Sequence, residues 1–327
     1  MSKQVLLTGM RPTSHLHVGN YFGALKNVVE LQKQYKTFLM IADLHALTTL
    51  ENTKNIAEDT LNIAALYIAG GINPKKVTLF IQSAVPEQAE LATLFNMITP
   101  VSMLELNPVY KEMLLEHPKA TNLGLLAYPV LQAADILAYK ATVVPVGKDQ
   151  SPHIELAREI ARRFNYHYGK LFLEPKTLLQ KELKILSLKD PNKKMSKSHE
   201  AQTHIGLLDS PKTIHKKIKS AVTDSGKEIV YDPFKKPAIS NLMMLMRLAS
   251  GTSIRLIEKK FQEKGYAVFK ESVADALIKL LAPMQERYNT LAENKKAVQK
   301  LLETGSKKAR IVAAETLKEA KQKIGLL

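Results

Sequence analysis

Residues 5–20 read VLLTGMRPTSHLHVGN, a short apolar run that ends in a loop containing glycine and proline. The run Val5–Thr8 has the composition of a buried strand, and the loop Gly9–Asn20 leads directly into a helical pattern. From Val18 to Tyr35, apolar residues recur at about the 3.6-residue spacing of a helix. This order of strand, loop and helix is typical of an open α/β sheet, whose ligands bind beyond the carboxyl ends of the strands.

Two further strands follow with a helix between them. Thr37–Ala42 (TFLMIA) and Val77–Gln82 (VTLFIQ) are continuous apolar runs, as expected for strands buried on both faces. The intervening helix runs from about Asn55 to Ala69 and is closed by Gly70–Gly71. Short strands joined by helices pair in parallel through right-handed crossovers. The sequence therefore predicts an α/β fold with a doubly wound parallel (Rossmann-like) sheet.

The middle of the chain continues this fold around a helical insertion. Residues 87–140 have a helical pattern in three or more pieces, broken at Pro100, Pro108 and Pro118. Further strands are expected at Ala141–Gly147 and Ile185–Leu188, with a helix over Ser151–Asn165 between them. The polar and basic segment 189–201 is expected to be an exposed, mobile loop.

After Gln202 the pattern is helical throughout. Six helices are expected, over residues 211–222, 238–250, 252–264, 267–280, 283–302 and 306–323. The sequence thus predicts an α/β domain over 1–204, followed by an all-α basic domain over 205–327.

Composition limits the possible functions. The chain carries 47 Lys and Arg residues against 31 Asp and Glu, and the net charge of +16 divides into +5 over 1–200 and +11 over 201–327. A basic second half fits either a nucleic-acid partner or a solvated lysine-rich surface. The lack of cysteine excludes disulfides, thiolate metal sites and cysteine nucleophiles. Because there is no signal peptide pattern and no apolar run of about 18 residues, we expect a cytoplasmic protein without a membrane segment.

The loop Gly9–Asn20 is a candidate phosphate site, since it enters a helix N-terminus whose free N–H groups favour anions. Gly19 permits close approach to the backbone, and His17 and Asn20 are donors within reach of phosphate oxygens. His17 also fits an ordinary surface turn. The run Lys194-Met195-Ser196-Lys197-Ser198 is a second candidate, because lysines on a mobile loop neutralise polyphosphate charge. Taken alone, it also fits a basic surface.

Together the two motifs resemble the signature pair of class I aminoacyl-tRNA synthetases. His17-Val18-Gly19-Asn20 is followed 177 residues later by the lysine-serine run. Asp43–Ala46, Tyr128–Leu137 and Val146–Gln150 resemble the subgroup for tryptophan and tyrosine. Three later stretches are similar to its bacterial tryptophan-specific members: Leu207–Pro211, Ala221–Ser225 and Ile239–Leu242.

The resemblance implies a two-step reaction, in which L-tryptophan and Mg-ATP give an adenylate and tRNA(Trp) then accepts the tryptophanyl group. Mg²⁺ is carried by ATP, and no metal site of the protein is expected. The resemblance also implies a homodimer built on the insertion around 87–140. The helical domain is expected to meet the anticodon through lysines around 212–219 and 255–264.

Site residues carry over from the family motif by motif. The catalytic residues expected are His17, Asn20, Lys194 and Lys197. The residues expected to bind ATP are Arg11, Pro12, Thr13, Gly19, Asn20, Gly147, Lys148, Asp149, Ile185, Lys194, Met195, Ser196, Lys197 and Ser198. Those expected at tryptophan are Asp135, Tyr128, Gln150, Leu7, His45, Gln132, Ile136, Val144 and Val146.

The physics of an indole pocket agrees with this assignment. Indole offers one N–H donor and no acceptor, so its site needs one buried acceptor within an apolar slot. Asp135 lies on a strongly apolar helical stretch, where an unpaired carboxylate is rare. The resemblance implies that Asp135 accepts the indole N–H and that Tyr128 and Gln150 hold the ammonium group. The alternative is a helix-face carboxylate paired with a lysine.

The chain departs from the family pattern at four positions: Arg11, Ser14, Gln132 and Lys148. A tyrosine-specific enzyme is one alternative function, but such an enzyme typically carries a tyrosine on the first strand, where Leu7 stands here. The others are a plain nucleotidyltransferase and a paralogue that binds nucleic acid without aminoacylating it. The paralogue would be marked by loss of His17 or the motif lysines, and all of these are present.

Overall fold

The computed structural model describes residues 3–12, 16–49, 52–116, 122–179, 183–196 and 200–327. These residues form two compact units. Unit 1 comprises Met1–Ser14, Val28–Glu182 and Asn294–Leu327, and unit 2 comprises His15–Asn27 and Leu183–Glu293. Both units combine segments that are distant in sequence, so they do not coincide with the consecutive stretches 1–204 and 205–327.

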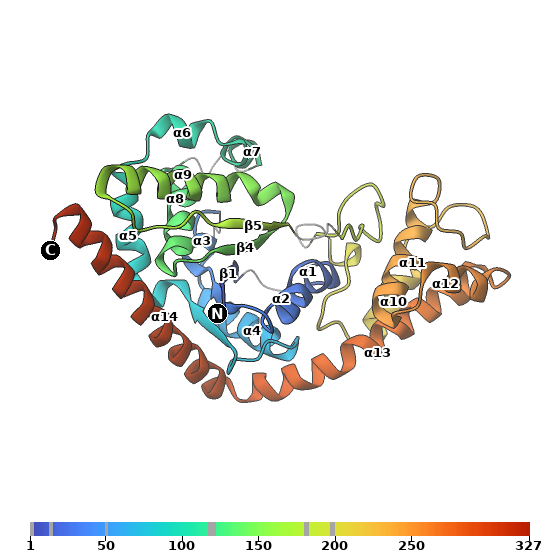
Figure 1. Cartoon of the computed structure of the whole chain (residues 1–327). Helices are drawn as coiled ribbons and strands as arrows, with labels where there is room; N and C mark the ends of the chain where they lie inside the picture. Colours follow the sequence, from blue (N-terminus) through green and yellow to red (C-terminus); the bar gives the residue numbers. More distant parts are fainter. Residues whose placement is uncertain (1–2, 13–15, 50–51, 117–121, 180–182, 197–199) are drawn as a thin grey trace. The chain divides into compact units, whose positions relative to one another are not determined.

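Unit 1 is built on a five-stranded sheet with the order β3-β2-β1-β4-β5 (Figure 1). The strands are β1 (Val5–Met10), β2 (Lys36–Ile41), β3 (Val77–Ile81), β4 (Val143–Val146) and β5 (Lys176–Leu179). Every neighbouring pair is parallel. The chain winds from β1 outward through β2 to β3, and then outward on the other side through β4 to β5. This confirms the doubly wound parallel sheet, with its switch point between β1 and β4.

The last strand differs from the prediction. Ile185–Leu188 is not a strand of the sheet, because its backbone bonds to the segment just after it: Met195 N donates to Ile185 O, and Ser187 N donates to Lys193 O. The fifth strand is instead Lys176–Leu179, at the sheet edge beside β4. Its four residues are only partly buried or exposed, so they lack the continuous apolar run that marks a buried strand.

One face of the sheet packs against the helical insertion. Leu7, Phe38, Met40, Phe80 and Val144 share a buried core with helices α5 (Pro86–Asn96), α8 (Leu123–Ala138) and α9 (Ser151–Tyr168). Because successive strand residues point to opposite faces, their neighbours Leu6, Leu39 and Leu79 are buried on the other side. There α4 (Ile56–Ala69) contacts β2.

The insertion is helical, as predicted. Besides α5 and α8 it holds α6 (Val101–Glu105) and α7 (Pro108–Glu116), so the chain breaks near Pro100 and Pro108. Three short helices border the sheet: α3 (Asp43–Ala46), η2 (Gln82–Ala84) and η4 (Lys148–Gln150). Among the described residues, no helix is both long and apolar enough to cross a membrane.

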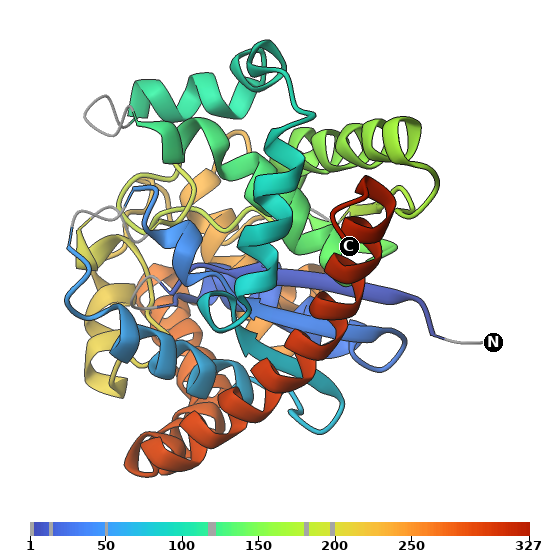
Figure 2. The ribbon, with the colours of Figure 1, turned by 90° about the vertical axis from the view of Figure 1, so that its left-hand side faces the viewer.

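The C-terminal helix α14 (Lys295–Ile324) belongs to unit 1 and packs along strand β3 (Figure 2). Ile81 N donates to Ser306 Oγ at 3.3 Å. A Cβ atom on Gly305 would lie 1.8 Å from Leu79 O, so only glycine allows this approach. The helix thereby covers the sheet edge that β3 would otherwise expose.

Unit 2 contains the remaining helices. They are α1 (Val18–Asn20), the π-helical turn η1 (Tyr21–Leu25), η5 (Ala201–Thr203), α10 (Pro211–Lys219), α11 (Pro237–Ser250), α12 (Ile254–Phe261) and α13 (Gly265–Glu293); α2 (Lys26–Leu31) straddles the division between the units. Helices α10 and α11 pack on α13, which forms the centre of this unit.

Two predicted helix breaks were wrong. The predicted break at 281–282, just before Pro283, lies inside α13, and the predicted break at 303–305 lies inside α14. Leu277, Leu281 and Met284 form one buried face across the proline, so packing outweighs its lost N–H. The break occurs instead at Asn294, whose side chain caps α14 by accepting from Ala297 N.

Candidate active site

The first motif forms a closed cap at the start of α1, in unit 2. Gly19 N donates to His17 Nδ1 at 3.0 Å, and His17 N donates to Asn20 Oδ1 at 3.1 Å. Because Nδ1 accepts a hydrogen bond, a neutral His17 ring carries its proton on Nε2. His17 is buried, and its ring orientation is therefore set by the local backbone.

Gly19 is required by this cap. A Cβ atom at position 19 would lie 2.8 Å from both Cε1 and Nδ1 of His17, closer than real Cβ contacts come. Any other residue would push the imidazole away from the backbone N–H that now orients it. The structure thus gives this glycine a local role in the cap that does not depend on a ligand.

The second motif lies beside the first. The position of a Gly19 Cβ is 4.0 Å from Met195 Cβ, so two segments 177 residues apart in sequence are neighbours within unit 2. Met195 is buried and its N–H donates to Ile185 O. Lys194 is exposed, and its backbone forms an isolated antiparallel β-bridge with Leu186. Ser196 is half-buried.

Asn241 holds the segment that precedes the second motif. Its Oδ1 accepts from Leu186 N at 2.8 Å, and its Nδ2 donates to Leu186 O at 3.0 Å. Sequence reasoning gave Asn241 no role, although it lies in one of the stretches that resemble the family. A buried asparagine that satisfies both backbone groups of one residue fixes that residue as a strand partner would.

Asp135 is the centre of the polar cluster in unit 1, where it is fully buried on α8. Its carboxylate accepts from His45 Nε2 at 2.7 Å, from Gln88 Nε2 at 2.6 Å and from Gln82 Nε2 at 2.9 Å. None of these partners is a lysine, so the alternative of a helix-face carboxylate paired with lysine is wrong. Burial raises the pKa of the Asp135 carboxyl above its usual value, and the three donors oppose that rise.

Gln82 and Gln88 were not among the predicted site residues. Both are fully buried, one in η2 at the end of β3 and the other on α5. The sequence held no clear signal for them, because Gln82 and Gln88 are two of several polar residues in the stretch 77–95. A single sequence could not say that both amides share one carboxylate.

Tyr128 lies two turns before Asp135 on α8, and its hydroxyl oxygen is 3.2 Å from His153 Nε2. Burial raises the pKa of Tyr128 to about 12, and the positive charge of Arg11 acts against this rise. The phenol therefore keeps its proton at neutral pH, and its hydroxyl can donate or accept a hydrogen bond. Arg11 is exposed and donates to Thr49 Oγ1 at 3.1 Å.

The apolar residues predicted for the tryptophan pocket belong to one large core. Leu7, Ile136 and Val144 belong to the core of unit 1, and Val146 packs against it. Gln132 and Gln150 are half-buried.

The other predicted nucleotide residues are distributed over both units. Gly147 precedes η4 as its N-cap, Lys148 is exposed, and Pro12 and Ile185 are buried. Thr13, Ser14, Lys197 and Ser198 lie outside the described residues, as does the side chain of Asp149.

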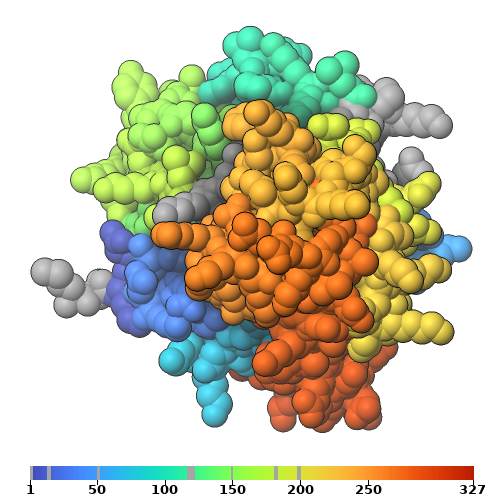
Figure 3. All heavy atoms as spheres, turned by 90° about the vertical axis from the view of Figure 1, so that its right-hand side faces the viewer, coloured from blue at the N-terminus to red at the C-terminus, as the bar shows by residue number. Residues whose placement is uncertain are grey.

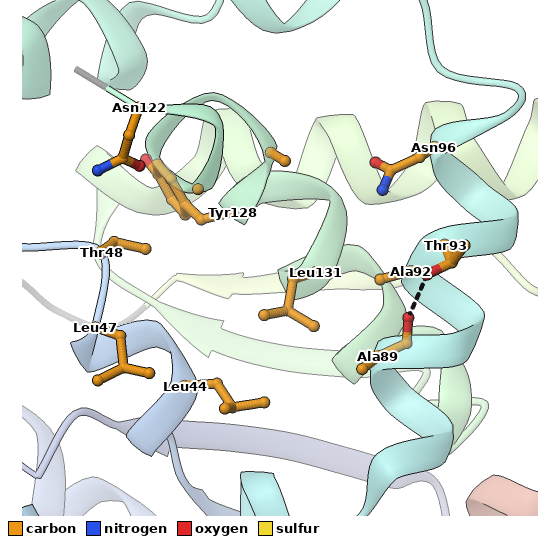
Figure 4. A pocket seen from close by; sticks show the side chains of 12 residues that line it. Leu44, Leu47, Thr48, Ala89, Ala92, Thr93, Asn96, Asn122, Tyr128 and Leu131 are labelled. Atoms are coloured by element: carbon orange, nitrogen blue, oxygen red, sulfur yellow. Dashed lines mark hydrogen bonds between the residues drawn. The ribbon is translucent and has the colours of Figure 1, made fainter. Parts of the chain in front are cut away.

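An apolar pocket of about 290 Å³ opens among α3, α5 and α8 (Figure 4). Leu44, Ala92, Leu131 and Tyr128 are among its lining residues. The same three helices carry His45, Gln88 and Asp135, and Leu131 precedes Asp135 by one helical turn. Of the residues predicted to bind tryptophan, Tyr128 lines this pocket.

Comparison with known proteins places the chain in a family. The family model for class I tRNA synthetases (W and Y) matches residues 2–282. The chain is 43% identical to a tryptophan–tRNA ligase from Halalkalibacterium halodurans, over 99% of this chain and 98% of that protein. It is 42% identical to a tryptophan–tRNA ligase from Caldanaerobacter subterraneus, over 98% of each chain.

A solved structure agrees in fold. The tryptophanyl-tRNA synthetase from Campylobacter jejuni, complexed with ADP and tryptophan, has a TM-score of 0.87 and 33% sequence identity, covering 98% of this chain and all of that one. Both the sequence and the fold match over nearly the full length. The chain therefore belongs to the tryptophan and tyrosine family of class I tRNA synthetases, within its branch of bacterial tryptophan–tRNA ligases.

Proposed function

We propose that this chain activates L-tryptophan with Mg-ATP and transfers the tryptophanyl group to tRNA(Trp). The observation that carries the proposal is Asp135, a fully buried acceptor within the apolar core of unit 1. Indole needs one such acceptor and no donor. The curated relatives are named tryptophan–tRNA ligases, and the Campylobacter structure holds ADP and tryptophan.

The pocket chemistry favours tryptophan over similar amino acids. Phenylalanine would leave the buried Asp135 carboxylate without the donor that it gains from indole, and a phenol presents its hydroxyl at a different place. When the wrong substrate leaves a buried polar group unpaired, its kcat/KM can be lower by a factor of about 10⁴–10⁵. In this proposal Leu7, Val144 and Val146 contact the indole ring, while Tyr128 and Gln150 hold the ammonium group.

Activation in this proposal needs no nucleophile from the protein. The tryptophan carboxylate attacks the α-phosphorus of ATP, the bond to the β-phosphate oxygen breaks, and tryptophanyl-adenylate and pyrophosphate result. The protein contributes positioning and charge. His17, Asn20 and the N-terminus of α1 contact the phosphates, and Lys194 and Lys197 neutralise the departing pyrophosphate. Mg²⁺ arrives as part of the Mg-ATP substrate, since phosphate oxygens are its preferred ligands.

Unit 2 is proposed to bind tRNA through lysines on α10 and α12. Lys212, Lys216 and Lys219 are exposed on α10, whereas Lys217 is buried and its Nζ lies 2.7 Å from Asp209 Oδ2. The expectation for residues 212–219 is therefore restricted to the three exposed lysines. In Figure 3 the side of unit 2 that carries α11, α12 and α13 faces the viewer, in amber and orange.

The protein is proposed to be a cytoplasmic homodimer. Met97, Leu106, Leu115 and Leu123, all within the insertion, are each at least 70% exposed. Several large apolar side chains left exposed within one insertion support a protein interface there. Sedimentation equilibrium should give twice the chain mass of 36.5 kDa, and a mass of one chain at working concentration would contradict the dimer.

ATP–pyrophosphate exchange tests the reaction and the acceptor together. We expect exchange with tryptophan and none with tyrosine or without amino acid. Asp135→Ala and the size-matched Asp135→Asn should lower kcat/KM for tryptophan by about 10- to 100-fold, because a hydrogen bond to a charged group is lost. The KM for ATP should stay unchanged as the control. Exchange with tyrosine alone would overturn the tryptophan pocket.

The cap of the first motif generates a separate expectation. Gly19→Ala places a Cβ against the His17 ring, so the imidazole leaves its position. Turnover in exchange should fall by about a hundredfold, the effect of moving a catalytic group by about 1 Å. Gly23→Ala is the matched control, since a Cβ there would meet no atom within 4 Å apart from its chain neighbours and its own helix backbone. Equal turnover in the two variants would remove His17 from the mechanism.

The tRNA surface is tested by titrating salt. A Lys212→Ala, Lys216→Ala, Lys219→Ala triple variant should bind tRNA(Trp) more weakly and show a smaller dependence of log Kd on log salt, by about 0.7–0.9 for each phosphate that a lysine no longer neutralises. Exchange without tRNA should be unaffected. A Lys300→Ala, Lys307→Ala, Lys308→Ala variant alters exposed lysines of α14 and is the control. If both triples weaken tRNA binding equally, α10 has no special role.

A further inference from the structure

The buried carboxylate of Asp135 receives hydrogen bonds that come from the protein itself. We propose that Gln88 and Gln82 are positioning residues for indole recognition: their amides hold the Asp135 carboxylate in place as an acceptor for the indole N–H. The proposal rests on the function proposed above and identifies which further residues set its specificity.

The geometry divides the donors into two kinds. Oδ1 of Asp135 accepts from Gln88 at 2.6 Å and from Gln82 at 3.1 Å, and Oδ2 accepts from Gln82 at 2.9 Å and from His45 at 2.7 Å. Both glutamines are fully buried, while the His45 side chain is 11% exposed. His45 is thus the one of these three donors with exposed surface, and the glutamines hold the carboxylate from inside the protein.

Gln88 has a feature that packing alone does not explain. None of the described residues donates to its Oε1, which is buried, while its Nε2 contacts Asp135 and lies 3.5 Å from Met40 Sδ. A buried acceptor without a donor costs stability. A methionine would fill a similar volume without that cost. The amide N–H toward Asp135 is therefore the function of this side chain.

Gln82 has two partners. Its Nε2 contacts both oxygens of Asp135, and its Oε1 accepts from His45 N at 3.2 Å. It thereby connects α3 to α8 across the end of β3. A substitution of Gln82 would also remove the acceptor for His45 N at the start of α3. A substitution of Gln88 therefore tests the contact with Asp135 more specifically.

This arrangement predicts that a substitution of Gln88 affects only substrates that carry the indole N–H. Without the Gln88 N–H, the carboxylate loses one of the donors that fix its orientation and oppose its protonation. Recognition of an indole N–H then weakens, while apolar contacts with the ring remain. A general defect of folding would instead affect all substrates alike.

The experiment compares tryptophan with 3-benzothienylalanine, in which sulfur replaces the indole N–H. We expect Gln88→Met to lower kcat/KM for tryptophan in ATP–pyrophosphate exchange by about tenfold, the lower range for a hydrogen bond to a charged group. The value for the sulfur analogue should change less than about twofold, so the preference for tryptophan shrinks. Gln82→Met should shift the preference in the same direction and is the second variant if Gln88→Met does not fold.

Gln32→Met is the matched control. Gln32 is also a buried glutamine of unit 1, and its Nε2 donates to Val29 O and Gly71 O rather than to a carboxylate. The control should keep the preference of the unaltered chain. An equal loss with both substrates in Gln88→Met, or an unchanged preference, overturns the positioning role. Failure of the unaltered chain to exchange with tryptophan overturns the proposed function itself.

Discussion

The pairing of the Asp135 carboxylate is the interaction on which the polar cluster of unit 1 depends. An isolated carboxylate in an apolar core is costly, so it must be hydrogen-bonded there. Here the donors come from α3, η2 and α5, while the acceptor is on α8. One carboxylate therefore connects four elements at the carboxyl end of the sheet. Because a buried carboxylate needs hydrogen-bond donors, the side chains around Asp135 must include groups that can donate to it.

The second constraint is the backbone cap in unit 2. His17 is oriented by the N–H of Gly19, and Gly19 is permitted there because it has no Cβ. The second motif packs beside this cap through Met195, and Asn241 holds the segment before it. His17 and Asn20, which are proposed to contact phosphates, are thus held by hydrogen bonds to backbone groups and require little further ordering when a ligand binds.

Much of the fold could be predicted from the sequence because its signals are local. The runs in β1, β2 and β3 have the length and apolarity of buried parallel strands, and the prolines at 100 and 108 break the insertion as expected. The motifs at His17 and Lys194 were recognisable because the two together, in this order along the chain, resemble the signature pair of one enzyme class. Asp135 was recognisable as a carboxylate within an apolar helix.

What the sequence alone determined is the periodic pattern, the motif residues and therefore the family and its chemistry. The tertiary structure decided which partners the patterned faces bury. An amphipathic helix such as α14 must cover an apolar face, but nothing in its own residues states that the face is strand β3 of unit 1. Likewise, the amides of Gln82 and Gln88 needed partners, and only the packing of three helices brought them to one carboxylate. Local pattern follows from chain neighbours, whereas such pairings depend on residues far apart in sequence.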